Sequence, residues 1–283
     1  MGAAGIAGSE SSAEAAPSGP LATSPRRTYS VAQGWAIAYQ LARLDVIRRY
    51  TATMLGVVWA VLSPLLQALV IGVVFGRLFG VPVREFLPYL FLNLTLWAFL
   101  VSCLNGGQIA FVAAEGYIKQ IPGVPLFAYP LRMALSALYT LALALLAVAI
   151  VVLAAGGRPG WTWLLVLPGL AAWFLFGLAV ASLAAVANTA VRDLEHIQAV
   201  AVQALFYATP IMYPASLLAD HGLAWMLTWN PVYHLLTLVY LPLLQGAVPS
   251  ASHYLAAALS VALALALARA AMRRAEPRVA FWL

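Results

Sequence analysis

The side chains best suited to bind a charged ligand are two adjacent arginines that precede a long uncharged run. Arg48 and Arg49 lead into Met54 to Phe75, a stretch without a charged residue. Guanidinium groups bind phosphate in a bidentate way, so the pair could bind a phosphate group. The alternative is ordinary anchoring, because arginines gather at the cytoplasmic ends of membrane spans. The residues themselves leave both interpretations open.

Amide and aromatic side chains inside apolar runs offer a second kind of chemistry. Amides bind sugar hydroxyls and aromatic faces bind sugar rings, but in helix bundles such groups also hydrogen bond one helix to another. For any single residue the helix-to-helix role is favoured, and only a row along one passage would indicate a sugar path. The residues are Trp59, Gln67, Asn93, Asn105, Gln108, Asn188, Gln203, Tyr207 and Tyr213.

The sequence lacks the common catalytic motifs. It contains no His-Glu-x-x-His, no Gly-x-Ser-x-Gly and no Gly-Lys-Ser/Thr, since its single lysine, Lys119, is followed by Gln120. His234 and His253 lie in or beside the last apolar segments, where packing is favoured over proton transfer. We therefore expect no catalytic residue, cofactor or metal in this chain, and if ATP drives the protein, another chain must bind it.

Composition predicts a membrane protein. Of the 283 residues, 64% are hydrophobic and 8% are charged, too few charged side chains to cover a soluble globule of this size. The formal net charge of +6 does not indicate nucleic acid, because the basic residues lie at the ends of apolar runs. The single cysteine, Cys103, excludes an internal disulfide.

Apolar runs of helical length predict an all-α integral membrane protein with six transmembrane helices. Residues 1–30 are expected to form a disordered cytoplasmic tail, and residues 31–50 an amphipathic interface helix or a plain lead-in to the first span. Prolines within 213–245 predict short outer half-helices, and 269–283 is expected to be a cytoplasmic tail. The expected spans are about 54–76, 86–114, 131–155, 163–187, 197–212 and 252–268.

The basic residues predict the orientation. Lys and Arg near the ends of spans resist translocation. With both termini inside, only Arg77, Arg84 and Arg158 of the 15 basic residues fall outside. The loop 115–130, which contains prolines, glycines and charges, is then cytoplasmic.

Four patterns follow one another from about residue 34 to the end of the chain. They are LDVIRRYTATMLGVVWAVLSPLLQ, then ANTAVRDLEHI with Arg192 and Asp193 at a turn, then TPIMYP, and last WNPVYHL with Asn230. Together they resemble the membrane permease subunit of type 2 ABC exporters of polysaccharides and polyol phosphates, which export O-antigen, teichoic acid, capsule or galactan chains. Leu44 replaces an arginine usual in that family, and the centre of the loop 115–130 also departs from its pattern.

The resemblance implies a homodimer with two copies of a separate nucleotide-binding ATPase. Force would enter through the loop 115–130, acting as a coupling helix, and through the segment 31–50. The glycan would thread a channel formed largely by the first and fifth spans and closed outside by 213–245. The expected coupling residues are Glu115, Tyr117, Lys119, Gln120 and Arg132. A cytoplasmic lip that binds the lipid diphosphate would contain Arg43, Asp45, Arg48, Arg49 and Tyr50, and the cytoplasmic turn would contain Arg192 and Asp193. The channel candidates are Trp59, Gln67, Gln203, Tyr207 and Tyr213, and the outer-gate candidates are Trp225, Trp229, Asn230 and Tyr233.

The expected function is ATP-driven export of a polyprenyl-diphosphate-linked glycan across the bacterial inner or plasma membrane. The identity of the glycan stays open, and a cell-wall galactan is as plausible as an O-antigen. One alternative is a type 2 ABC permease for a drug or small lipid, which would favour an apolar cavity. Another is an integral-membrane enzyme acting on lipid carriers, which would turn over its substrate without an ATPase.

Overall fold

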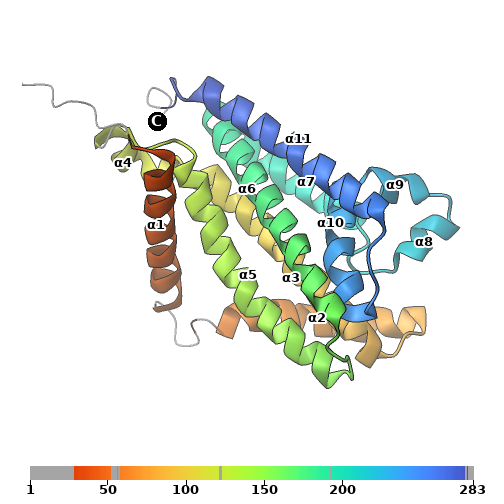
Figure 1. Cartoon of the computed structure of the whole chain (residues 1–283). Helices are drawn as coiled ribbons and strands as arrows, with labels where there is room; N and C mark the ends of the chain where they lie inside the picture. The colour runs from red at the N-terminus through yellow and green to blue at the C-terminus, as the bar shows by residue number, and fades with distance from the viewer. Residues whose placement is uncertain are drawn as a thin grey trace, which may run out of the picture.

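The structure is a computed structural model that describes residues 29–51, 56, 58–120, 123–191, 193–277 and 279. This part of the chain folds into a bundle of helices (Figure 1). The long helices are α1 (Val31–Thr51), α2 (Val58–Phe79), α3 (Val83–Ile109), α5 (Ala128–Ala154), α6 (Val166–Ala190) and α11 (Ala251–Ala275). The shorter ones are α4 (Glu115–Gln120), α7 (Leu194–Ala208), α8 (Ala215–Asp220), α9 (Ala224–Trp229) and α10 (Pro231–Tyr240), with 3-10 turns at Val112–Ala114 and Trp161–Leu165 and a π-helical turn at Leu241–Gln245.

Among the described residues, five helices are long and apolar enough to cross a membrane, and Pro231–Gln245 is a shorter apolar helix. The five are Val61–Leu78, Val83–Ile109, Ala128–Ala154, Trp161–Ala190 and Ala251–Ala275. The expected all-α membrane fold is thereby confirmed.

The predicted fifth and sixth spans differ in their bounds from the helices that the structure contains. The fifth, 197–212, corresponds to α7, whose 15 residues extend about 22 Å, short of the ~30 Å of a hydrocarbon core. The sixth was expected to end at residue 268, but α11 continues through Arg269 and Arg273 to Ala275, because alanine and arginine both favour the helix. The predicted tail 1–30 lies outside the described residues except for Tyr29 and Ser30.

Helix α3 forms the centre of the bundle. Fifteen of its 27 residues are buried, compared with four of 25 in α11, and it packs against α2, α5, α6 and α10. Leu90, Phe91 and Leu96, which point in different directions around the helix, are all fully buried. A helix that is apolar on every side is stable only when it is covered on every side.

Helices α3 and α6 approach closely at glycines. A Cβ atom on Gly107 of α3 would lie 2.3 Å from the carbonyl oxygen of Ala181. A Cβ atom on Gly177 of α6 would lie 2.8 Å from the ring of Phe99. Contacts through small residues are typical of membrane helices, where close backbone approach supplies much of the packing energy.

Helix α1 begins at a capping box. The Ser30 hydroxyl accepts a hydrogen bond from the Gln33 backbone N–H at 3.3 Å, and the Gln33 side chain accepts one from the Ser30 N–H at 2.8 Å. This reciprocal pair satisfies two backbone donors that have no partner within the helix.

The face by which α1 packs consists of small side chains. Gly34, Ala38 and Ala42, spaced four apart, are buried, and Ala38 packs against Ala128 of α5. Larger apolar residues such as Trp35 are exposed. Helix α1 lies along the first part of α5 (Figure 1).

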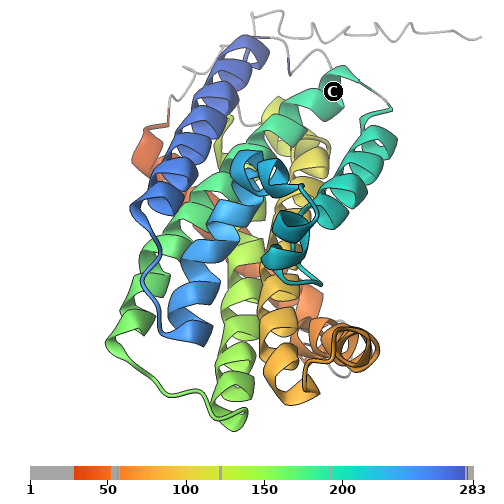
Figure 2. The same ribbon diagram turned by 90° about the vertical axis from the view of Figure 1, so that its right-hand side faces the viewer.

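Figures 1 and 2 define the two ends of the bundle. Helix α4, the start of α1 and the end of α11 lie at one end, which we call the α4 end (Figure 1). The turns that join α2 to α3 and α5 to α6 lie at the opposite end (Figure 2). Helices α8 and α9 project from the bundle beside α10 (Figure 1).

Candidate functional site

The predicted coupling loop contains the short helix α4. Ile118 of α4 packs against a buried cluster at the α4 end that includes Phe111, Tyr129 and Ala275, so the loop is attached to α3, α5 and α11. Glu115 is half-buried in the first turn of α4. The side chains of Tyr117, Lys119 and Gln120, and residues 121–122, lie outside the described residues. The coupling roles of these residues stay predictions.

Arg132 binds Asp45 rather than standing alone beside the loop. Its Nε and Nη2 atoms donate to the two carboxylate oxygens of Asp45, each at 2.5 Å. The two side chains are only 14% and 21% exposed. A bidentate, charge-assisted pair of this kind is strong and directional. Sequence reasoning placed the two residues in separate groups, and the structure joins them across α1 and α5.

The other lip and turn residues are only partly placed by the structure. Arg43 and Arg48 are exposed on α1, and Asp193 is exposed just before α7. Arg192 and the side chains of Arg49 and Tyr50 lie outside the described residues. Binding of a lipid diphosphate at this lip stays a prediction.

Asn230 joins the third sequence pattern to the fourth. Its Oδ1 accepts from the backbone N–H groups of Val232 at 2.9 Å and Tyr233 at 3.3 Å, which caps α10. Its Nδ2 donates to Thr209 Oγ1 at 2.8 Å and to the Ala208 carbonyl at 3.3 Å. Only an amide combines an acceptor for the cap with donors for the end of α7. The predicted gate residue Asn230 is therefore a buried connection between α7 and α10.

Tyr89 of α3 holds the same TPIMYP segment from the other side. Its hydroxyl lies 2.5 Å from the carbonyl oxygen of Pro210 and 3.1 Å from that of Tyr213. Trp173 of α6 donates from Nε1 to the Leu235 carbonyl at 3.0 Å, which ties α10 to the bundle. The segment between α7 and α11 is thus fixed by side chains from α3 and α6.

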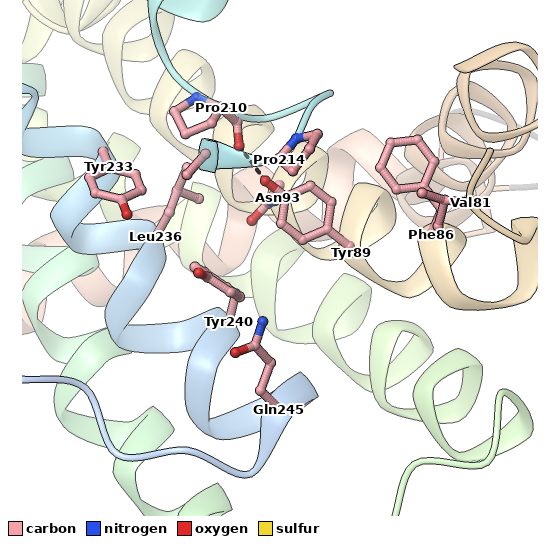
Figure 3. A pocket seen from close by; sticks show the side chains of 11 residues that line it. Val81, Phe86, Tyr89, Asn93, Pro210, Pro214, Tyr233, Leu236, Tyr240 and Gln245 are labelled. Atoms are coloured by element: carbon pink, nitrogen blue, oxygen red, sulfur yellow. Dashed lines mark hydrogen bonds between the residues drawn. The ribbon is translucent and has the colours of Figure 1, made fainter. Parts of the chain in front are cut away.

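A cavity of about 230 Å³ lies between α3 and α10. Figure 3 shows Tyr89, Asn93, Tyr233, Tyr240 and Gln245 around it. The Asn93 Oδ1 atom is buried and has no hydrogen-bond partner among the described residues. The sequence identified Asn93 only as an amide in an apolar run, and it did not single out Tyr89 or Tyr240. The one feature that could have indicated these two residues is a tyrosine within an apolar run.

The other predicted gate aromatics are surface residues. Trp225 and Trp229 of α9 are 61% and 82% exposed. Their role in an outer gate stays a prediction.

The two histidines of the last segments form a pair. His234 Nε2 lies 3.0 Å from the Thr228 carbonyl, which can only accept, so this nitrogen carries the hydrogen. The Nδ1 atoms of His234 and His253 lie 2.9 Å apart, within hydrogen-bond distance of each other. The pair connects α10 to α11 near the N-terminus of α11.

The channel candidates lie on exposed parts of α2 and α7. Trp59 and Gln67 are exposed on α2, and Gln203 and Tyr207 on α7, of which none of the fifteen residues is buried. Tyr213 is half-buried and donates to the Tyr207 carbonyl at 2.6 Å. Burial raises the pKa of Tyr213, so its phenol stays protonated near neutral pH.

Two of the amides noted in the sequence link helices. Asn188 of α6 donates to the Gln108 carbonyl at 2.9 Å, and Gln198 of α7 donates to Asn105 of α3 at 3.2 Å. The helix-to-helix role expected for a typical amide is therefore observed at these positions. Gln67 and Gln203, by contrast, project from exposed faces.

The fold is all-α, with several apolar helices long enough to cross a membrane, and amide hydrogen bonds and an ion pair connect its helices. These features define a multi-pass membrane protein. Residues 38–243 match the ABC-2 type transporter family, and the chain belongs to that family. It is therefore a transport subunit, the membrane part of an ABC transporter, and such permeases work with ATPase partners.

Similar proteins include three O-antigen export permeases. The chain is 28% identical over 227 residues to the O-antigen export system permease protein RfbA of Myxococcus xanthus, covering 78% of this chain and 85% of the relative. It is 25% and 26% identical to two proteins of the same description from Klebsiella pneumoniae, each covering 66% of this chain and 72% of the relative.

Proposed function

We propose that this chain is the transmembrane channel subunit of an ATP-driven exporter that moves a lipid-linked polysaccharide from the cytoplasmic side across the bacterial inner or plasma membrane. Two copies of the chain form the channel, and two copies of a separate ATPase bind ATP and Mg²⁺ at the α4 end. Both termini lie in the cytoplasm. The names of the similar O-antigen permeases support the choice of a polysaccharide.

The observation that carries this proposal is a pair of exposed amides, Gln67 and Gln203, on the largely apolar, uncovered faces of α2 and α7. Gln67 lies within the apolar run Val61–Leu78, and Gln203 lies in the apolar helix α7, yet both amides are exposed. An amide facing hydrocarbon without a partner costs a few kcal/mol, on the order of 2. A second copy of the chain and a hydrated passage between the copies would remove this cost and supply a path for sugar hydroxyls.

The ion pair at the lip supports a diphosphate-bearing substrate. The carboxylate of Asp45 would repel a diphosphate, but it is neutralised by Arg132. Arg43 on the same helix is exposed, and its guanidinium group is suited to phosphate.

The test is reconstitution with the partner ATPase in proteoliposomes and measurement of ATP hydrolysis and glycan translocation. We expect polyprenyl-diphosphate-linked glycan to stimulate hydrolysis, and Gln67→Leu with Gln203→Leu to lower translocation about tenfold or more with the complex intact. Leu263→Ala on the exposed face of α11 is the matched control. Stimulation by drugs or small lipids but not by the glycan would favour the small-lipid permease, and failure to bind any ATPase would reject the exporter.

A further inference from the structure

A groove at the α4 end lies away from the predicted passage. It has a volume of about 410 Å³ and opens between α1, the segment before α5, α6 and α11. Its walls are apolar and its rim is charged. The apolar side chains are Trp35, Phe127, Leu178, Leu265 and Met272, and the charged ones are Arg269, Arg273 and Glu276.

Two arginines of α11 face this groove together. Arg269 and Arg273 are four residues apart, so they lie on the same side of the helix about one turn from each other. Both are exposed, and neither has an ion pair recorded within the described part of the chain. With Glu276 the residues lining the groove carry one net positive charge, which suits an anionic ligand.

The depth of the groove follows from α11 itself. Residues 251–268 contain no Asp, Glu, Lys or Arg and extend about 27 Å, close to the thickness of the hydrocarbon core. Arg269 therefore lies at the boundary where lipid phosphates are found. Leu265 lies one turn deeper, on the hydrocarbon side, and Arg273 one turn further out. The groove is apolar towards the bilayer and cationic towards the headgroups.

We propose that this groove binds one anionic glycerophospholipid. The phosphate lies between Arg269 and Arg273, and an acyl chain lies along Leu178 and Leu265. Basic pockets between membrane helices at the headgroup level are suited to anionic lipids. Because Trp35 of α1 and Arg269 of α11 both line the groove, the lipid contacts both helices.

The test is a lipid titration of the purified full chain in detergent, with bound lipid read by native mass spectrometry. Phosphatidylglycerol and phosphatidylcholine are compared at matched acyl chains. We expect a preference for phosphatidylglycerol of about thirtyfold, or about fivefold for each arginine. Arg269→Gln with Arg273→Gln should remove the preference. Arg158→Gln with Arg274→Gln, which removes the same charge outside the groove, should retain it.

A second variant probes the acyl part of the groove. Leu265→Trp should fill it and weaken binding of both lipids, while gel filtration and melting temperature report that the fold is intact. Retention of the preference in the Arg269→Gln, Arg273→Gln variant would overturn the proposal. Complete displacement of phosphatidylglycerol by inorganic phosphate at equal concentration would also overturn it, since the groove would then bind a free anion. Complete displacement by polyprenyl phosphate at equal concentration would overturn it too, since the groove would then bind the export substrate. Loss of phosphatidylglycerol binding when the ATPase is added would likewise overturn it, by assigning the groove to that partner.

Discussion

Asp45 of α1 and Arg132 of α5 form a bidentate ion pair between residues 87 positions apart in the sequence. Arg132 follows the loop that contains α4, and Asp45 lies in the helix that leads to the first span. A displacement of the loop towards or away from the bundle therefore moves α1 as well as α5. The pair connects the two segments through which an ATPase is proposed to act.

Removal of either partner should destabilise the protein and weaken coupling. Asp45→Asn or Arg132→Gln leaves a largely buried charge without its counterpart, which should cost about 1–3 kcal/mol, between the values for exposed and fully buried pairs. Thermal unfolding in detergent measures this cost, and substrate-stimulated ATP hydrolysis of the complex measures the coupling. The exchanged variant, Asp45→Arg with Arg132→Asp, should recover part of the thermal stability and part of the stimulated ATP hydrolysis. If the exchange recovers neither property, the pair does not connect α1 to α5.

Because of the ion pair, charge reversal at Arg132 and charge reversal at Lys119 test different properties of the protein. Arg132→Glu places two carboxylates together and breaks the contact between α1 and α5, so its effect reports on the fold as well as on ATPase contact. Lys119→Glu changes the charge of α4 and leaves both residues of the ion pair unsubstituted. We expect Lys119→Glu to lower ATPase binding about tenfold by analogy with other charged contacts and to leave the melting temperature unchanged. Pull-down of the ATPase against a salt series measures this effect, and unchanged binding would remove Lys119 from the coupling surface.

The helical membrane fold could be predicted from the sequence, because uncharged runs determine where a helix spans the membrane and prolines determine where it breaks. Both effects depend only on residues close together in the chain. The contacts between distant segments could not be predicted in this way. Asp45 and Arg132 each had a plausible separate role, and Asn230 appeared as a gate residue although its amide is buried between α7 and α10. The end of α7 at Ala208 was missed because the apolar run continues through Ile211 and Met212 after the helix has ended.

Asn230 offers a test of the connection between α7 and α10. Asn230→Asp keeps the oxygen that caps α10 but replaces the donors to Ala208 and Thr209 with an acceptor, whereas Asn230→Ala removes both. We expect Asn230→Ala to cost about 2–4 kcal/mol, the sum of a cap and buried groups left without partners, and Asn230→Asp to recover at most the ~1 kcal/mol of the cap. Thermal unfolding in detergent measures both values. Equal stability of the Asp variant and the wild type would mean that the bonds to α7 contribute nothing.

Tyr89 should contribute through its hydroxyl alone. Tyr89→Phe removes the donor that lies within reach of the Pro210 and Tyr213 carbonyls but keeps the ring, so we expect a loss of about 1–2 kcal/mol. The TPIMYP segment should also exchange its amide hydrogens faster, which hydrogen exchange with mass spectrometry can locate. Tyr254→Phe is a suitable control, because no hydrogen bond of its hydroxyl is recorded among the described residues. Equal exchange in the two variants would show that Tyr89 does not hold the segment.

The close crossing of α3 and α6 gives the sharpest test of the packing. Gly107→Ala would place its Cβ atom 2.3 Å from the Ala181 carbonyl oxygen, and because that atom belongs to the backbone of α6, the two helices must move apart. We expect a loss of about 1–3 kcal/mol or more from overpacking. Gly116→Ala in α4 is the matched control, since nothing lies within 4 Å of its Cβ position and alanine favours the helix by up to about 1 kcal/mol. The two substitutions should therefore shift the melting temperature in opposite directions, and a shift in the same direction would mean that the crossing is looser than the structure shows.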